Sequence, residues 1–334
     1  MIRHRILASL ILFFLLIGTA CIKRITVPET LPTNEPVEVA ELVNRINAFN
    51  QIDTLAAQGG IKVTNYFTDK ENKADELPGG DQLIRFKKPE NILLKVKAPI
   101  IGKQVADMAT DGKKFSLAIF YPGSKRQFIY GTNPKQFKKM TAKDLTDPRL
   151  KEAGGLVNMR PQHITDAFKM LPFDQGFDLF REEVTQEEPD TRPGRKGKRV
   201  YRNYYVLYLI ERKNGGTTNM AVLRRKFWFD RTISNTPLTR VQVFENDGEL
   251  ASDIYYLEWF KVENSDKMCP GRIVVDRRDD GYKLELTFEK DSTEINGEIP
   301  DKAFELQNLE KLPETNLDEP RKPQPASPKK NSKP

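Results

Sequence analysis

This 334-residue chain has few cysteine and histidine side chains, which serve as nucleophiles, bases and ligands of transition metals. The cysteines are Cys21 and Cys269, and the histidines are His4 and His163. A structural zinc site needs several Cys or His ligands, and a Ser-His-Asp triad in a chain without its amino terminus would depend on His163 alone. No phosphate-binding or dinucleotide-binding glycine motif is present. We therefore expect a binding protein that is not an enzyme and that holds no cofactor or metal.

The amino terminus has the pattern of a secretory signal. Arg3 and Arg5 precede an apolar run of 12 residues, 6–17, which is shorter than the roughly 20 residues that span a bilayer core. Small residues at 18–20 then lead to Cys21. This order predicts a signal peptide at 1–20 that is removed on export. Its removal takes away two basic residues and no acid, so the formal charge falls from +7 to +5.

The segment 18–21 resembles the lipobox of bacterial lipoproteins, in which the cysteine receives diacylglycerol before cleavage. Gly18 departs from the Leu, Val or Ile usual at that position, and the alternative is an ordinary signal peptide with an incidental cysteine. The resemblance implies lipidation of Cys21 and a membrane anchor made of N-terminal acyl chains. Ile22 stands where retained inner-membrane lipoproteins carry aspartate, which implies an outer-membrane lipoprotein facing the periplasm if the cell is Gram-negative.

Composition divides the rest of the chain into three parts. Residues 21–36 hold three prolines without apolar periodicity and are expected to form a flexible tether. Residues 311–334 are basic and proline-rich, which predicts a disordered tail. The folded body is then 37–310. Its mildly basic surface suits anionic headgroups, but no basic block is dense enough to indicate nucleic acid.

The body shows two helical patterns and many strand patterns. Apolar residues at helical spacing predict helices at 37–51 and 162–171. Period-two alternation and Asp-Gly turns predict short-turn antiparallel connections. The expected strands are 61–67, 82–87, 92–98, 104–110, 114–121, 127–130, 176–184, 200–212, 221–230, 238–245, 252–262, 271–276 and 282–290.

The segment 282–289 is the clearest strand, with one apolar and one polar face. A sheet of this kind has one face in water and one that must be covered. Two short helices can cover about a dozen strands only if the sheet curls. We therefore expect a mainly β (α+β) fold: a strongly curved antiparallel half-barrel sheet of about a dozen strands, with an N-terminal helix and a mid-chain helix covering the concave face.

Several turn and strand segments resemble the LolA/LolB-like group of periplasmic lipoprotein carriers and receptors. They are 55–61, 86–93, 109–115, 121–122, 128–131, 227–230, 237–240 and 300–304. The resemblance implies an open half-barrel whose apolar concave face binds the acyl chains of a lipid or an acylated protein. This chain departs from the simplest members by its longer middle section, which includes 181–199.

Binding of an acyl chain needs an apolar cavity and a movable cover, and no nucleophile. Each methylene moved from water gains about 0.8 kcal/mol, or on the order of 12 kcal/mol for 16 carbons. The candidate wall residues lie on three predicted strands, and the alternative is that they pack as ordinary core. They are Phe227, Phe229, Val241, Val243, Tyr282, Leu284, Leu286 and Phe288.

Three other features have simpler interpretations. Acidic residues at 182–190 followed by basic residues at 192–199 could form a charged binding loop, but a solvated hairpin is the expected form. His163 is expected to be partly exposed on its helix, and Cys269 to be an unreactive thiol.

The alternative function is a structural or stress-sensing envelope lipoprotein that uses the curved sheet to dock an envelope protein partner.

Overall fold

The computed structural model describes residues 27–67, 74–77, 79–99, 101–121, 126–133, 139–144, 154–170, 176–215, 218–263 and 265–318. The predicted signal peptide and Cys21 lie outside the described residues, so both stay predictions. Within the described part, one large sheet and two α-helices carry most of the chain.

The strands follow the period-two segments of the sequence closely. The helices are α2 (Val39–Asn50) and α4 (Pro161–Thr165). The first-half strands are β1 (Glu29–Thr30), β2 (Thr54–Asn65), β3 (Asp75–Glu76), β4 (Gly80–Lys87), β5 (Asn91–Lys97), β6 (Gln104–Asp111), β7 (Lys114–Ile119) and β8 (Gln127–Thr132). The second-half strands are β9 (Phe177–Pro189), β10 (Arg199–Gly215), β11 (Thr218–Asp230), β12 (Leu238–Phe244), β13 (Leu250–Leu257), β14 (Phe260–Lys261), β15 (Met268–Cys269), β16 (Arg272–Arg277), β17 (Tyr282–Thr287), β18 (Glu294–Ile295) and β19 (Glu314–Asn316).

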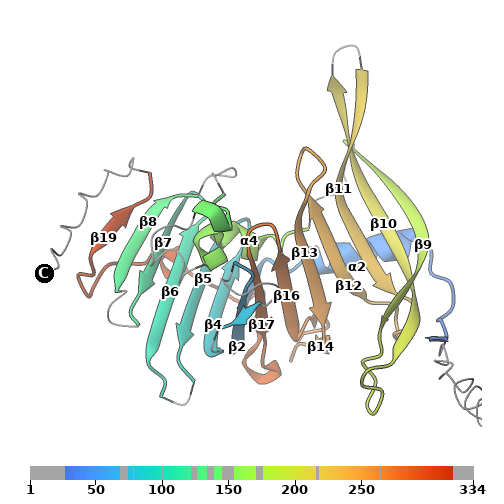
Figure 1. Cartoon of the computed structure of the whole chain (residues 1–334), viewed down its shortest axis with the longest axis horizontal. Coiled ribbons are helices and arrows are strands. Elements are labelled where there is room, and N and C mark those ends of the chain that lie inside the picture. Colours follow the sequence, from blue (N-terminus) through green and yellow to red (C-terminus); the bar gives the residue numbers. More distant parts are fainter. Residues whose placement is uncertain are drawn as a thin grey trace, which may run out of the picture.

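The main sheet is a continuous antiparallel path. From one edge to the other, the long strands pair in the order β9, β10, β11, β12, β13, β16, β17, β2, β4, β5, β6, β7 and β8. Figure 1 shows that the sheet curves and that its two ends lie far apart, so it stays open. The predicted fold class is confirmed. The sheet has 17 strands because four short ones, β1, β3, β18 and β19, join the long strands.

The two predicted helices form and bury their apolar sides against the sheet. Leu42, Ile46 and Phe49 of α2 are buried in the same apolar cluster as the strands. The mid-chain helix is shorter than expected, because regular α-helix ends at Thr165 and turns follow to Phe168. Phe168 still packs into the cluster, so the predicted contact is kept without a regular helix.

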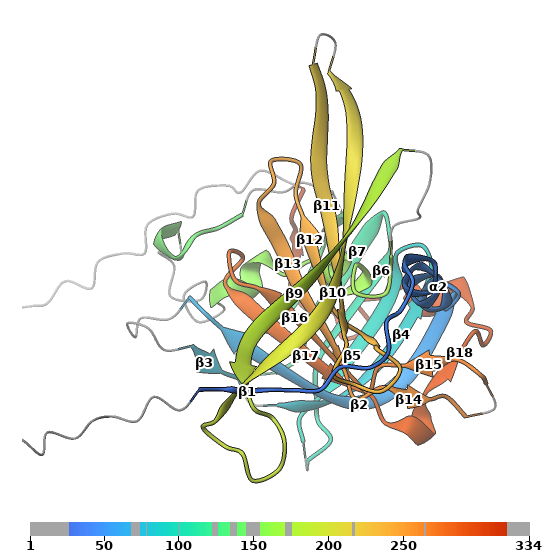
Figure 2. The ribbon, with the colours of Figure 1, turned by 90° about the vertical axis from the view of Figure 1, so that its right-hand side faces the viewer.

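Both predicted terminal segments are shorter than expected. Glu29–Thr30 of the expected tether form β1, which pairs in parallel with β10 (Figure 2), and Leu31 is buried. At the other end, Leu312 is buried and Glu314–Asn316 form β19 in parallel with β8. Composition did not reveal these two ordered segments. One buried apolar side chain is enough to order a short strand where a neighbouring strand offers unpaired backbone groups for hydrogen bonds.

Candidate ligand-binding interior

The concave face carries an unbroken row of apolar side chains. The row consists of directly opposed residues on seven neighbouring strands: Leu207, Phe227, Val241, Ile254, Val275, Leu284 and Val63. The first six are at most 1% exposed, and Val63 packs against them. Cross-strand neighbours of this kind have Cβ atoms about 5 Å apart, so the row is a continuous wall across half of the sheet.

The structure brings all eight predicted wall residues to this one face. Seven of them are buried in the main apolar cluster, and Val243 packs against it half-buried. The predicted wall residues on β11 and β12 are far in sequence from those on β17. Ile254 and Val275 lie between the two sets in the sheet and connect them. These two linking residues were absent from the prediction, although both stand in predicted strands. Every member of the wall also packs as part of the core.

Helix α2 covers the wall with three side chains. Leu42 and Ile46 are fully buried, and the Phe49 ring meets the rings of Tyr256 and Trp259 edge-on at centroid distances of 5.5 and 5.9 Å. Burying such side chains is worth about 1.5–3 kcal/mol each, so α2 is held mainly by the hydrophobic effect.

The polar side-chain attachment of α2 is made at one turn, and at the end of the helix Lys88 donates to the Asn50 carbonyl oxygen. Arg45 donates to the carbonyl oxygens of Asn235 and Thr236 and pairs with Glu41 on its own helix. Asn235 and Thr236 have φ values of 63° and 41°, in the left-handed region that non-glycine residues avoid. One arginine therefore links the cover to a turn held in an unfavourable backbone conformation.

The segment around α4 covers the other part of the wall. Phe168 stacks on Phe86 at 5.0 Å, and the Tyr256 hydroxyl donates to the carbonyl of Ala167 at 2.7 Å. The expectation of a partly exposed His163 was wrong, because its ring is 3% exposed and lies 2.6 Å from the Tyr282 hydroxyl oxygen. Burial, together with Arg277, Arg160 and Lys139, holds the pKa of His163 well below its usual value.

One buried cation in this interior lacks hydrogen-bond partners. Arg225 precedes Phe227 by two residues on β11, shares its face, and is 4% exposed. Its Nε and Nη1 atoms have no partner among the described residues. Burial lowers the pKa of Arg225, and the Asp166 carboxylate opposes that shift without a described ion pair. Buried unpaired donors are costly, so this position is a candidate for contact with an anionic group.

A second buried arginine has partners by contrast. Arg277 donates to Asp280 and to the Ser252 hydroxyl. Lys139 adds an ion pair to Asp280 at 3.0 Å. This cluster links residue 139 of the mid-chain segment to the β16–β17 turn, so its role is structural.

The two described hollows lie elsewhere. One, of about 510 Å³, is lined by charged loop residues such as Lys261, Asp266 and Lys290, and the other, of about 160 Å³, by residues that include Arg85 and Ile299. Neither includes a member of the apolar row. Cys269 is 1% exposed, and burial raises its pKa to about 12, which leaves little thiolate at neutral pH.

No group of three or more Cys, His, Asp or Glu side chains in the described part of the chain has a metal-binding arrangement. Neither helix in these residues has the length and apolar character needed to cross a bilayer.

Comparison with known proteins gives similarity at the level of solved structures only. No protein family and no curated protein matches the chain. A LolA superfamily protein from Nitrosomonas europaea is 14% identical at a TM-score of 0.39, covering 81% of this chain and 99% of that one. A putative outer membrane lipoprotein-sorting protein domain from Vibrio parahaemolyticus is 10% identical, with a TM-score of 0.38 and coverage of 79% and 94%. A DUF1329 family protein from Desulfovibrio piger is 9% identical, with a TM-score of 0.37 and coverage of 79% and 95%.

Proposed function

We propose that this protein is a membrane-anchored envelope lipoprotein that binds the acyl chains of a lipid or an acylated protein inside its curved sheet, as a receiver or carrier. The observation that carries the proposal is the apolar row across seven strands, which shares its face with the unpartnered guanidinium of Arg225. A lipid offers the matching pair of groups, because apolar chains suit the row and a phosphate or carboxylate suits the arginine. The proposed ligand wall comprises the row and the eight predicted residues.

The interior is filled by α2 and the 161–170 segment, so a ligand would have to displace one of them. Transfer from a bilayer to an apolar interior is nearly balanced in free energy, since both environments bury the acyl chain. This near balance suits a cover that is held by apolar contacts and by a few hydrogen bonds from Arg45 and Lys88. The buried thiol of Cys269 and the buried ring of His163 support binding without catalysis.

Native mass spectrometry of the mature protein purified from membranes is the direct test. We expect the mass of an acylated Cys21 and, on part of the population, an additional lipid mass. Replacement of Arg225 by Gln should reduce the lipid-bound fraction without changing acylation. Acylation with no retained lipid under any extraction condition would contradict the binding function.

A second measurement tests the cover. Arg45→Gln removes the attachment of α2 to residues 235–236 and should speed the uptake of a fluorescent fatty acid several-fold. Arg126→Gln is the matched control, because it removes an exposed ion pair, with Glu310, far from α2. Equal uptake rates in both variants would mean that α2 is not the cover.

One observation favours the alternative function, a structural or stress-sensing lipoprotein that docks a protein partner. The wall is already filled by the chain's own side chains, as a docking scaffold would need. Retention of a protein instead of a lipid through purification would favour this function.

A further inference from the structure

The charged segment of the middle section separates into two surfaces in the structure. Its glutamates lie on edge strand β9 and have partners. Glu183 pairs with Arg231 at 2.6 Å, and Glu188 accepts from the Tyr204 hydroxyl at 2.9 Å. The basic residues lie beyond β9, in the hairpin tip of residues 190–198 that leads into β10.

Three cations of this tip make no direct side-chain contact, although the charge of Arg195 contributes to the lowered pKa values of Glu29 and Asp190. Arg195, Lys196 and Lys198 are exposed, and their side chains make no ion pair or hydrogen bond within the described residues. Arg192, in contrast, pairs with Asp190 and with Glu29, each at 2.8 Å. The tip therefore presents a concentrated positive charge to solvent.

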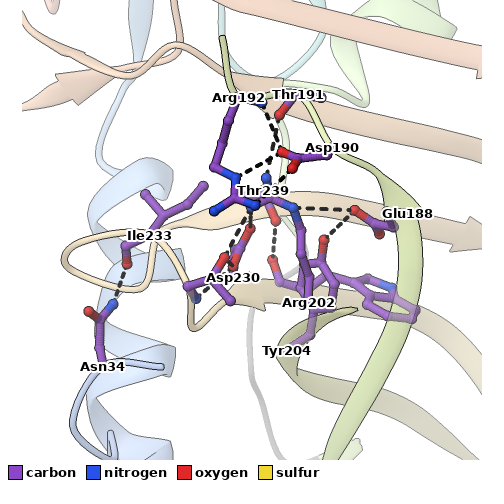
Figure 3. A network of polar contacts seen from close by, with 12 residues as sticks. Asn34, Glu188, Asp190, Thr191, Arg192, Arg202, Tyr204, Asp230, Ile233 and Thr239 are labelled. Atoms are coloured by element: carbon purple, nitrogen blue, oxygen red, sulfur yellow. Dashed lines mark hydrogen bonds and ion pairs between the residues drawn. The ribbon is translucent and has the colours of Figure 1, made fainter. Parts of the chain in front are cut away.

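The tip has a fixed position on the molecule. Figure 3 shows Arg192 turned toward Asp190, and Arg202 lying between Glu188 and Asp230. Asp190 is 6% exposed, so the base of the tip is anchored in the fold although its end is in water. Charges on an anchored base cost less conformational entropy on binding than charges on a free chain.

The amino-terminal segment reaches the body beside this tip. Because β1 runs parallel to β10 with Glu29 opposite Val200, the residues that precede Glu29 point toward the tip end of β10. Val27 stands there with 74% of its surface exposed. Only the residues 22–26 separate Val27 from Cys21, and six fully extended steps reach about 20 Å at most.

We propose that Arg195, Lys196 and Lys198, with Val27 beside them, form a membrane-contact surface that binds anionic phospholipid headgroups. The Glu29–Arg192 ion pair links the arriving chain to the tip, and charge complementarity supplies the attraction. A Cys21 anchor, which belongs to the proposed function, would hold Val27, at the base of the tip, within about 20 Å of the membrane. The tip also acts as a second, electrostatic contact with the bilayer.

The test uses the chain from Ile22 onward, which contains every described residue and has no acyl anchor. We compare how much of this chain sediments with phosphatidylcholine vesicles and how much sediments with vesicles in which about one-third of the phosphatidylcholine is replaced by phosphatidylglycerol. We expect binding to the anionic vesicles alone, decreasing as salt shortens the Debye length. R195Q/K196Q/K198Q should bind at least about tenfold more weakly.

The control variant is K113Q/K302Q/K311Q, which removes the same charge from exposed positions in the other half of the sheet. This control should bind the anionic vesicles as strongly as the parent chain does. Both triple variants keep the basic residues after 318, so these residues are the same in all the chains that are compared. Thermal unfolding of all three proteins confirms that they are equally folded.

Equal weakening of the two triple variants would overturn the proposal, because net charge alone would then explain binding. So would equal binding to both vesicle types. Neither outcome bears on acylation or on the proposed binding of acyl chains in the interior, since this chain carries no anchor and the assay needs no bound ligand.

Discussion

At the scale of single residues, two buried arginines show opposite uses of the same side chain. Arg277 has a carboxylate and a hydroxyl as partners, whereas two donors of Arg225 have none in the described structure. A buried charge without partners lowers stability, and removing one half of a buried pair lowers it as well. The two positions therefore predict effects of opposite sign.

Replacement of Arg225 by Met should raise the free energy of unfolding by on the order of 1–3 kcal/mol, because a buried unpaired guanidinium is replaced by an apolar chain of similar length. Arg277→Met should lower it by about 3–5 kcal/mol, since Asp280 stays buried without its cation. Urea unfolding followed by circular dichroism measures both. A loss of stability in Arg225→Met would show that the guanidinium is satisfied.

His163 predicts a specific dependence of stability on pH. Its pKa in the folded protein lies well below the ordinary value of 6.5, so only the unfolded chain takes up a proton as the pH falls through that value. The free energy of unfolding should therefore decrease below about pH 6.5, by up to about 1.4 kcal/mol per pH unit, until the pH reaches the lowered value.

His163→Gln isolates this contribution from the carboxylates, because glutamine can hydrogen-bond Tyr282 and does not titrate. Denaturant unfolding at pH 7, 6 and 5 should show a smaller decrease for the variant than for the parent. Parallel curves would indicate that the ring is protonated in the folded state.

At the scale of elements, the alternation of apolar and polar residues predicted the long strands. The apolar row on the concave face follows from this alternation. The segment 282–289 gave Tyr282, Leu284 and Leu286 one face, and the structure buries that face. Pattern could not reveal which strands become neighbours. The pairing of β17 with β2 joins residues more than 200 positions apart, and it depends on packing of the whole sheet.

The burial of Arg225 could not be foreseen either, because a charged residue in a strand pattern indicates the wet face. His163 was misplaced for a related reason: the helical spacing of its neighbours showed the apolar side, but not that Tyr282 of a distant strand lies against the ring. Both errors concern polar groups enclosed by contacts distant in sequence.

The contact between the 154–158 turn and the β16–β17 turn requires the absence of a side chain. A Cβ atom on Gly155 would lie 2.0 Å from the Gly281 carbonyl oxygen. Gly155→Ala should therefore lower the free energy of unfolding by about 1–3 kcal/mol through overpacking. Gly79→Ala is the control, since its nearest neighbour is at 3.4 Å. Thermal unfolding of both variants is the measurement, and equal midpoints would contradict the contact.

At the scale of the whole molecule, the folded body extends beyond the limits set by composition. A chain ending after Asp318 should unfold at the same temperature as the full chain. A chain ending after Lys311 should lose about 2–4 kcal/mol, because Leu312 leaves the contact with Phe128 and the β8 edge loses β19. Equal midpoints for the two truncated chains would show that β19 adds no stability.

An open sheet leaves two strand edges on which other chains could polymerise. At one end, the three-residue strand β19 covers part of β8 and is too short to serve as a template. At the other, β9 carries exposed Glu182, Glu183 and Glu187, and Phe180 is the exposed aromatic among them. Two copies meeting edge to edge at β9 would bring these carboxylates close together, which disfavours pairing at this edge.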